Sequence, residues 1–270
     1  MSGPSHTQPP SSPTPPLSPQ VNNGVNGEWQ FAYENGATAN ATIQNFHNSF
    51  ITEADWAYMA KQQVNTVRIP VGWWMMTDPQ TEAPFVGSYS TVLDWAFSMG
   101  RKYKIRIWVD LHALKGSQSG VGNTAVRDGL GQWLNPSNVN VHLNFISWLC
   151  QRYVPNPMFL GIGLVNEAYS TSSPLDLYQQ YLTRAYALVR TYSQCLIVSM
   201  AARIYSNEWA DVLYLNLNHD TTNVWIEVHN YDVFSGLNLN ATQEVAHVKN
   251  DVGLFIQMLQ SVSNRNGDDV

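Results

Sequence analysis

Charged residues are scarce in this chain: Asp, Glu, Lys and Arg make up 13% of its 270 residues, about half of the usual share in globular domains. The net charge is −6 and no basic stripe occurs, which argues against nucleic acid as a partner. A window of about twenty apolar residues is missing as well, so the sequence predicts no membrane span. These absences narrow the class of protein without naming a function.

The N-terminal segment lacks features of an ordered or secreted start. Its first residues, MSGPSHTQPP, contain no apolar stretch of the kind that a secretory signal needs. We therefore expect either an intracellular protein or a chain that does not include the true N-terminus. The next segment, PSSPTPPLSPQ, is so rich in Pro and Ser that it favours neither a helix nor a ladder strand. We expect a disordered tail or linker over residues 1–27 and a domain over residues 28–270.

Cysteine is also scarce, with only Cys150 and Cys195 in the chain. The apolar pattern places Cys150 on a helix face and Cys195 at the start of a strand. We expect two buried free thiols, because free Cys packs as a small hydrophobic side chain. A disulfide is the alternative, and two cysteines do not settle the redox compartment.

Apolar and aromatic residues are plentiful by contrast. The apolar share is 44%, and the chain contains ten Trp and thirteen Tyr. Such a composition allows a real core and supplies many flat side chains that can line a cleft. The length permits one large domain, although it does not by itself separate one barrel from two smaller domains.

Short apolar runs rich in Val and Ile alternate with segments of helical period. Several runs are apolar almost without interruption, as strands buried on both faces are. The clearest helix is predicted over residues 174–192, with Pro174 just inside its start. Thr52 and Asp55 resemble a capping box at the start of another helix. The predicted strands cover residues 64–71, 105–112, 159–165, 195–200 and 224–231.

This alternation predicts an α/β fold with a parallel sheet and right-handed crossovers. The repeat of roughly 30 to 50 residues is within reach of a (β/α)₈ TIM barrel with insertions. With five predicted strands, an open doubly wound sheet is the alternative on periodicity alone. No glycine-rich phosphate loop follows the first strand, which weighs against a nucleotide-binding fold.

Polar residues stand where the predicted strands end, and in a parallel barrel the active site lies at that opening. Each has a simple structural explanation: an arginine that pairs a carboxylate, a satisfied core histidine, or a cap for the next helix. Trp73 and Trp74, after the first strand, are as compatible with the core as with a sugar platform. The shared position of the polar residues at the strand ends nevertheless favours an active site. The polar residues are Arg68, Asp110, His112, Asn166, Glu167, Arg203, His229, Tyr231 and Asp232.

An asparagine and a glutamate beside histidines, a tyrosine and tryptophans fit glycoside hydrolysis. That reaction needs one protonated carboxylic acid, which donates to the leaving oxygen, and a second carboxylate as nucleophile or base. Burial in an aromatic pocket with few charges would raise the pKa of Glu167 toward the working pH. Asn166 would bind the sugar 2-hydroxyl, while His229 and Tyr231 would orient the carboxylates.

Five motifs resemble glycoside hydrolase family 5, in particular its exo-β-1,3-glucanase and β-glucosidase branches. The resemblance extends from about Phe50 to about Phe234. The motifs are FITEADWAYMAKQQVNTVRIPVGWW, DLHALKGSQSG, RDGLGQW, GIGLVNEA and WIEVHNYDVF. Family 5 enzymes are retaining (β/α)₈ barrels with two catalytic glutamates, so the resemblance implies that fold and a β-glucan or β-glucoside substrate.

The resemblance also implies roles for individual residues. Glu167 would be the catalytic acid/base, and neither a cofactor nor a metal is implied. We expect a monomer, and the linkage, exo or endo action and transglycosylation stay open. The substrate-binding residues would be Arg68, His112, Asn166, His229 and Tyr231.

The sequence also departs from the family pattern. Lys115 replaces a proline, and Ala168 replaces the proline of the Asn-Glu-Pro motif. The first strand of the family has no convincing copy before Phe50, and the nucleophile of the seventh strand is expected after Val270. The five strands would then be strands two to six of an incomplete barrel, with two open edges prone to aggregation. Glu227 is disfavoured as a substitute nucleophile, because the family does not use that position.

Two other functions stay open from the sequence alone. One is a catalytically inactive fragment or a carbohydrate-binding barrel remnant. The other is a metal-dependent hydrolase that uses His112, Glu167 and His229, which the lack of a His-x-His cluster disfavours. N-glycosylation acceptor patterns at Asn40 and Asn240 tilt the interpretation toward an extracellular enzyme, with a cytoplasmic location as the alternative.

Overall fold

The computed structural model describes residues 27–266, except 78–83, 88, 121–123, 125–131, 205–214, 216–221, 228 and 230–238. The chain divides into two compact units, Met1–Glu227 and Val228–Val270. The predicted division into a tail over residues 1–27 and a domain over residues 28–270 stays a prediction, because residues 1–26 lie outside the described part.

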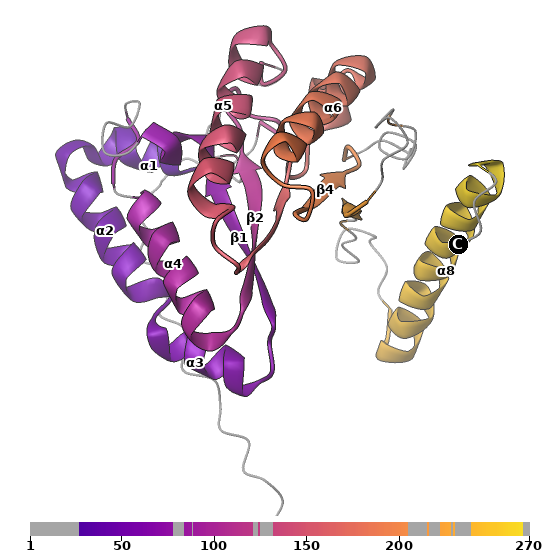
Figure 1. Ribbon diagram of the computed structural model, residues 1–270, viewed down its shortest axis with the longest axis horizontal. Helices are drawn as coiled ribbons and strands as arrows, with labels where there is room; N and C mark the ends of the chain where they lie inside the picture. The colour runs from indigo at the N-terminus through magenta and orange to yellow at the C-terminus, as the bar shows by residue number, and fades with distance from the viewer. Residues whose placement is uncertain are drawn as a thin grey trace, which may run out of the picture. The chain divides into compact units, whose positions relative to one another are not determined.

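The first unit is built on a parallel sheet of five strands in the order β1-β2-β3-β4-β5 (Figure 1). This order follows the chain without a reversal, whereas a doubly wound sheet reverses at a switch point. The doubly wound alternative is therefore wrong, and the winding is that of a barrel. The strands are β1 Thr66–Gly72, β2 Arg106–Ala113, β3 Phe159–Gly163, β4 Ile197–Ala201 and β5 Val224–Glu227.

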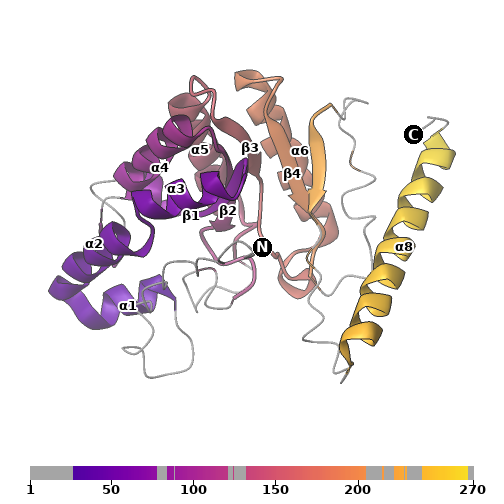
Figure 2. The same cartoon turned by 90° about the horizontal axis from the view of Figure 1, so that it is seen from below.

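Helices connect the strands, and α4, α5 and α6 lie on the same face of the sheet (Figures 1 and 2). Short 3₁₀ helices, η1 Gly36–Thr38, η2 Trp73–Thr77 and η4 Ser170–Ser172, join the longer elements. The helices of the first unit are α1 Glu28–Asn35, α2 Ala39–Phe50, α3 Glu53–Lys61, α4 Tyr89–Tyr103, α5 Pro136–Tyr153 and α6 Leu175–Tyr192.

Local signals in the sequence explain where two of these helices begin. The capping box before α3 is confirmed, since the Thr52 amide donates to Asp55 Oδ2 at 2.7 Å. The predicted start of α6 is off by one position. Pro174 has an extended ψ of 134° and precedes the helix as its cap residue, so it is not its first residue. The predicted apolar stripe of α6 does face the core, with Tyr178, Tyr181 and Leu182 buried.

The core lies between the sheet and its helices. Ile107, Val109 and Leu111 of β2 are all 0% exposed, and the buried residues of α4 and α5 belong to the same core cluster. Trp73 and Trp74 are buried as well, so they are core residues. Only β3 and β4 are buried along almost their whole length, as strands covered on both faces are.

Both cysteines are free thiols, as predicted, but only one is buried. Cys150 lies inside on α5, where burial raises its pKa to about 12. Cys195 is exposed, which corrects the prediction that both are buried. It precedes the first residue of β4, Ile197, and so lies in the connection rather than in the strand.

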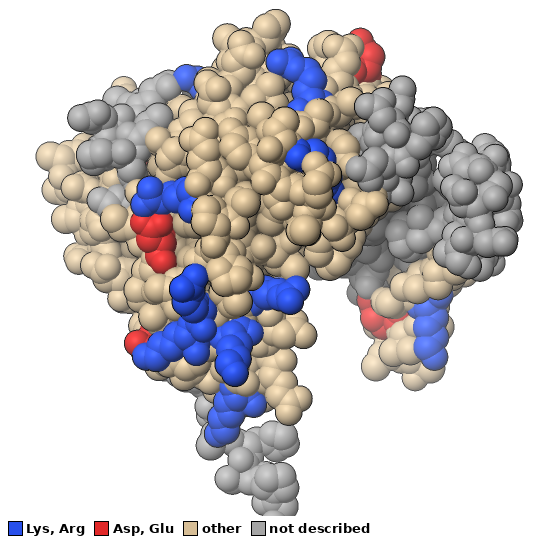
Figure 3. Space-filling view, in the orientation of Figure 1, with Lys and Arg blue, Asp and Glu red and all other residues tan. Residues whose placement is uncertain are grey.

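Basic side chains gather at one end of the first unit in Figure 3, over the ends of α3 and α4. The last turns of these helices carry Lys61, Arg101 and Lys102. β1 and β2 begin next to these turns in the sequence, so the basic side chains stand at the amino ends of the strands. The predicted site belongs to the other ends.

The second unit contains helix α8, Ala241–Asn266. The apolar residues Val245, Val248, Val252 and Ile256 of α8 are exposed. Within the described part of the chain, no helix combines the length and apolar character that crossing a bilayer would require.

Candidate active site

Arg68, the third residue of β1, is the centre of a polar cluster that includes residues of β2 and of the segment after β3. Its Nη2 atom donates to Asn166 Oδ1 at 2.9 Å and lies 3.0 Å from Asp110 Oδ2. Asp110 Oδ2 is also 2.8 Å from His112 Nδ1. Three successive strands therefore contribute to one network, and it brings together three predicted site residues, Arg68, His112 and Asn166.

Glu227 completes this cluster from β5. Its Oε2 atom lies 3.4 Å from Arg68 Nη2, and its Oε1 atom accepts a hydrogen bond from the Ser199 hydroxyl. Gly163 makes room for this pair, because a Cβ atom at that position would lie 2.8 Å from Glu227 Oε1. Glu227 is thus held by an arginine and a serine in the wall of the cluster.

The carboxylates of the cluster are more deeply buried than its cationic and imidazole groups. Asp110 is 0% and Glu227 is 7% exposed, whereas the side chains of Arg68 and His112 are 31% and 29% exposed. Burial raises the pKa of Asp110, although its hydrogen bond to His112 and the charge of Arg68 act in the opposite direction. The negative charge of Glu227 adds to the rise.

Glu167 follows directly after Asn166 and is half-buried. Its φ angle is 42°, which is in the left-handed region that side chains other than glycine rarely adopt. The Asn166 amide donates to the Leu111 carbonyl at 3.2 Å and so fixes the chain just before Glu167. The predicted acid/base therefore stands at the carboxyl end of β3, next to the Arg68 cluster in the sequence.

The remaining predicted residues lie elsewhere in the chain or outside its described part. Half-buried His229 belongs to the second unit, and Tyr231 and Asp232 lie outside the described residues. Arg203 donates from Nη1 to the Ser173 carbonyl at 2.6 Å, in the connection before α6. The roles of His229 and Tyr231 therefore stay predictions.

Lys115, which departs from the family pattern, has a defined place beside the site. Its Nζ atom lies 4.7 Å above the centre of the Trp73 ring, a cation–π contact. The lysine thus covers a core tryptophan.

Sequence reasoning missed three residues that shape the site. Gln118 is fully buried and donates from Nε2 to the carbonyl oxygens of His112 and Asn166. Ser199 donates a hydrogen bond to Glu227, and Gly163 leaves room for its carboxyl group. Gln118 belongs to the quoted motif DLHALKGSQSG, so the motif was a usable signal, whereas nothing local marks Ser199 or Gly163.

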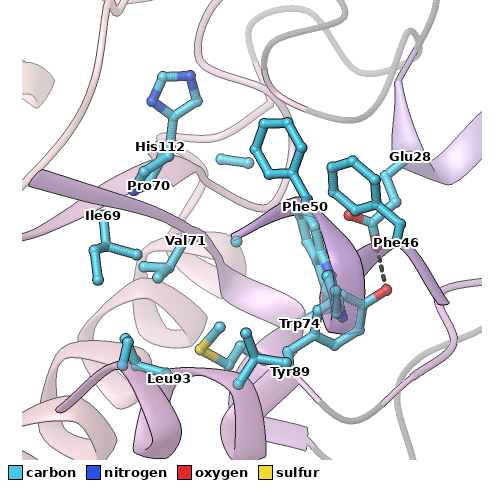
Figure 4. A pocket seen from close by; sticks show the side chains of 16 residues that line it. Glu28, Phe46, Phe50, Ile69, Pro70, Val71, Trp74, Tyr89, Leu93 and His112 are labelled. Atoms are coloured by element: carbon cyan, nitrogen blue, oxygen red, sulfur yellow. Dashed lines mark hydrogen bonds between the residues drawn. The ribbon is translucent and has the colours of Figure 1, made fainter. Parts of the chain in front are cut away.

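A cavity of about 430 Å³ lies beside β1. Figure 4 shows it lined by Phe46, Phe50, Trp74 and Tyr89, with Glu28 hydrogen-bonded to the Tyr89 hydroxyl. Burial raises the pKa of Glu28 to about 7, although the hydrogen bonds from Tyr89 and Trp74 lower it. His112 also lines this cavity, beside Pro70.

The described side chains of the site do not form a group of metal ligands. Within the described ranges there is no group of three or more His, Cys, Asp or Glu residues that could hold a metal ion. The metal-dependent hypothesis thus gains no support from the described part of the chain.

Comparison with known proteins identifies related sequences. The family description "Cellulase (glycosyl hydrolase family 5)" matches residues 28–266. The "Glucan 1,3-beta-glucosidase I/II" of Saccharomyces cerevisiae is 30% identical over 218 residues, which cover 78% of this chain and 48% of that protein. The "Glucan 1,3-beta-glucosidase" of Yarrowia lipolytica is 33% identical over 214 residues, with coverages of 75% and 49%. The chain thus spans about half the length of these relatives.

Solved structures show the same fold at low identity. The rutinosidase from Aspergillus niger superimposes with a TM-score of 0.66 at 16% identity, over 77% of this chain and 62% of that chain. The endoglucanase Cel5A from Thermotoga maritima gives 0.57 at 13% identity, over 81% and 69%. The five parallel strands therefore form part of a (β/α)₈ barrel, as predicted.

Proposed function

This chain belongs to glycosyl hydrolase family 5, and on that premise we propose that it is part of a retaining hydrolase of β-glucosidic bonds in which Glu167 is the acid/base. One observation carries the proposal. Arg68, Asp110 and His112 form a hydrogen-bonded cluster around Asn166, immediately beside Glu167. The names of the relatives, glucan 1,3-beta-glucosidases, support a β-1,3-glucan as the substrate.

In the first chemical step, Glu167 donates its proton to the oxygen of the leaving group while the glycosidic C–O bond breaks. A second carboxylate attacks the anomeric carbon, and the family resemblance expects it after Val270, in the remainder of the protein. Glu167 then takes a proton from the water that releases the sugar. The half-buried position of Glu167 leaves its carboxyl group accessible to the water of the second step.

Asn166 is oriented as a donor toward the substrate. Its Oδ1 atom accepts the hydrogen bond from Arg68, which assigns Nδ2 to the other side of the amide. That Nδ2 atom is buried and has no hydrogen-bond partner among the described residues. A buried donor without a partner is costly, so a sugar hydroxyl at this point would gain the hydrogen bond that the protein leaves open.

His112 is oriented in the same way by Asp110. The carboxylate at 2.8 Å from Nδ1 favours the tautomer with its proton on that nitrogen. Nε2 then serves as an acceptor for a substrate hydroxyl. With 29% of its side chain exposed, the imidazole is accessible to a bound sugar.

We also propose that the protein acts outside the cell as a monomer. Asn40 and Asn240, which occupy the two glycosylation acceptor patterns, are both exposed. An exposed asparagine is accessible to the glycosylation machinery, which supports the extracellular assignment.

The proposal is tested by substituting Glu167→Gln in the whole protein that contains this chain. For an aryl β-glucoside with a poor leaving group, we expect kcat/KM to fall by about 10²- to 10⁴-fold, the usual contribution of a general acid. The phenolate of an aryl β-glucoside with an acidic phenol leaves without being protonated. For that substrate kcat/KM should therefore fall far less.

Glu53→Gln is a suitable control, because Glu53 is exposed on α3 and its partner is Lys102. Equal losses on both substrates would contradict the role of Glu167 as the acid. Sugar binding without turnover in the unsubstituted protein would favour the alternative of a carbohydrate-binding remnant.

A further inference from the structure

Gln118 cross-links the ends of two strands through its side chain. Its Nε2 atom donates to the His112 carbonyl at 2.7 Å and to the Asn166 carbonyl at 3.0 Å. Its Oε1 atom accepts from the Leu114 amide at 3.1 Å. The residue is 0% exposed, so these bonds form away from solvent and satisfy every polar atom of the amide.

The main chain of Gln118 holds the other side of the same loop. Its carbonyl accepts from the Tyr169 amide at 3.0 Å and from the Ser172 hydroxyl at 2.8 Å. Gln118 is therefore bonded both to Asn166, directly before Glu167, and to Tyr169, two residues after it.

Glu167 needs such support because of its backbone conformation. Its φ of 42° is disfavoured for a residue with a Cβ atom, and such strain persists only where the surroundings hold it. The Ile204 amide donates to the Ala168 carbonyl at 2.8 Å and adds a third point of attachment. The loop is thus fixed on both sides of the strained position.

We propose that Gln118 is a positioning residue for the acid/base, an inference that rests on the proposed function of Glu167. The amide keeps Glu167 in the left-handed conformation and so fixes the direction of its carboxyl group. Because the same Nε2 atom holds the His112 carbonyl, it also sets the distance between the ends of β2 and β3. Gln118 acts through the loop and does not itself touch the substrate.

The first test uses this chain alone and needs no enzymatic activity. Gln118→Met keeps the length of the side chain and removes its hydrogen bonds. We expect amide hydrogen exchange at Asn166 and Tyr169 to accelerate by about tenfold or more, since each lost bond weakens the loop. The amides of α6 serve as internal controls. Unchanged exchange at Asn166 and Tyr169, or equal acceleration in α6, would overturn the proposal.

A double-mutant cycle tests whether the side-chain amide of Gln118 holds Glu167 in its strained backbone conformation. Glycine adopts a positive φ freely, so in a Glu167→Gly background Gln118→Met should lower the melting temperature by less than in the parent chain. Glu167→Gln retains the Cβ atom and is the matched control, in which the full loss should persist. Equal losses in both backgrounds would show that Gln118 does not hold the strained conformation.

The catalytic consequence is tested on the whole protein. Gln118→Met should lower kcat/KM, and the loss should be larger for the poor leaving group than for the acidic phenol, because kcat/KM reports the step in which Glu167 acts as the acid. A loss that is independent of the leaving group would refute positioning of the acid. If Glu167→Gln itself shows no leaving-group dependence, the proposed function fails, while the exchange and coupling results still decide the role of Gln118 in the loop.

Discussion

One guanidinium group balances two buried carboxylates at the site. Arg68 lies 3.0 Å from Asp110 and 3.4 Å from Glu227, and both carboxylates are within the interior. Removal of the arginine would leave two buried negative charges without their cation, which is strongly destabilising in proteins. Arg68 therefore supports the fold as well as the orientation of Asn166.

Glu28 gives a prediction at the residue scale. Its pKa is raised from 4.5 to about 7 by burial in the cavity beside β1. Between these two pH values the unfolded chain has lost its proton and the folded chain has kept it. The protonated Glu28 therefore contributes to the free energy of unfolding below pH 4.5. This contribution, up to about 3 kcal/mol, is lost as the pH rises through 7.

Glu28→Gln abolishes this titration and keeps an acceptor for Tyr89. We expect the variant to gain stability relative to the parent chain between pH 4.5 and pH 8, as measured by urea unfolding at both values. Glu53→Gln is the control without this change, since the hydrogen bond from Lys102 lowers the pKa of Glu53 and places its titration at and below pH 4.5. Parallel stability curves for the Glu28 variant and the parent would contradict the prediction.

The sequence allowed the prediction of individual site residues but not of their partners. Arg68, His112, Asn166 and Glu167 were recognisable because they are polar residues within or just after apolar strand runs. Ser199 was not, because its hydrogen bond to Glu227 joins two different strands. Gln118 belongs to a recognisable motif, but its hydrogen bond to Asn166 joins segments far apart in the chain. Such pairings depend on the register of the strands, and no local pattern encodes it.

At the scale of elements, two glycines of β3 set its distance from its neighbours. A Cβ atom on Gly161 would lie 2.4 Å from the backbone oxygen of Ile197 in β4. One on Gly163 would meet the flexible end of Glu227 at 2.8 Å. Relief of the clash at Gly161 would require the paired strands β3 and β4 to move apart. Relief of the clash at Gly163 would require only a shift of the Glu227 side chain.

Gly161→Ala should therefore destabilise the chain by about 1–3 kcal/mol, the usual cost of overpacking, as measured by urea unfolding. Gly163→Ala is the matched comparison at the other end of β3, and we expect a smaller loss because the carboxylate can shift. Equal effects of the two substitutions would show that Ile197 does not limit the spacing of β3 and β4.

The predictability of the elements follows from their apolar patterns. All five strands were recognisable, because each coincides with a short apolar run rich in Val and Ile. The ends differ by a few residues, and β5 ends at Glu227 where the pattern continued to residue 231. Helix α1 was not predicted, because its sequence EWQFAYEN is short and half of its residues are polar.

At the scale of the whole molecule, the sheet has two outer strands. Among the described strands, β1 pairs only with β2 and β5 pairs only with β4. An unpaired strand offers its backbone groups to another chain. In β5 the side chain of Trp225 is 48% exposed, and its ring packs edge-to-face against Trp108 of β2 with the ring centroids 6.0 Å apart.

We expect this chain alone to associate in a concentration-dependent manner through β5, and Trp225→Lys to reduce the association. A lysine on an edge strand opposes pairing, because two such edges repel and the charge must be desolvated. Sedimentation velocity over a range of concentrations measures the effect. Tyr33→Lys is the matched control, because Tyr33 is 68% exposed on helix α1, which has no strand edge. An equal reduction by both substitutions would indicate general apolar adhesion instead of pairing at β5.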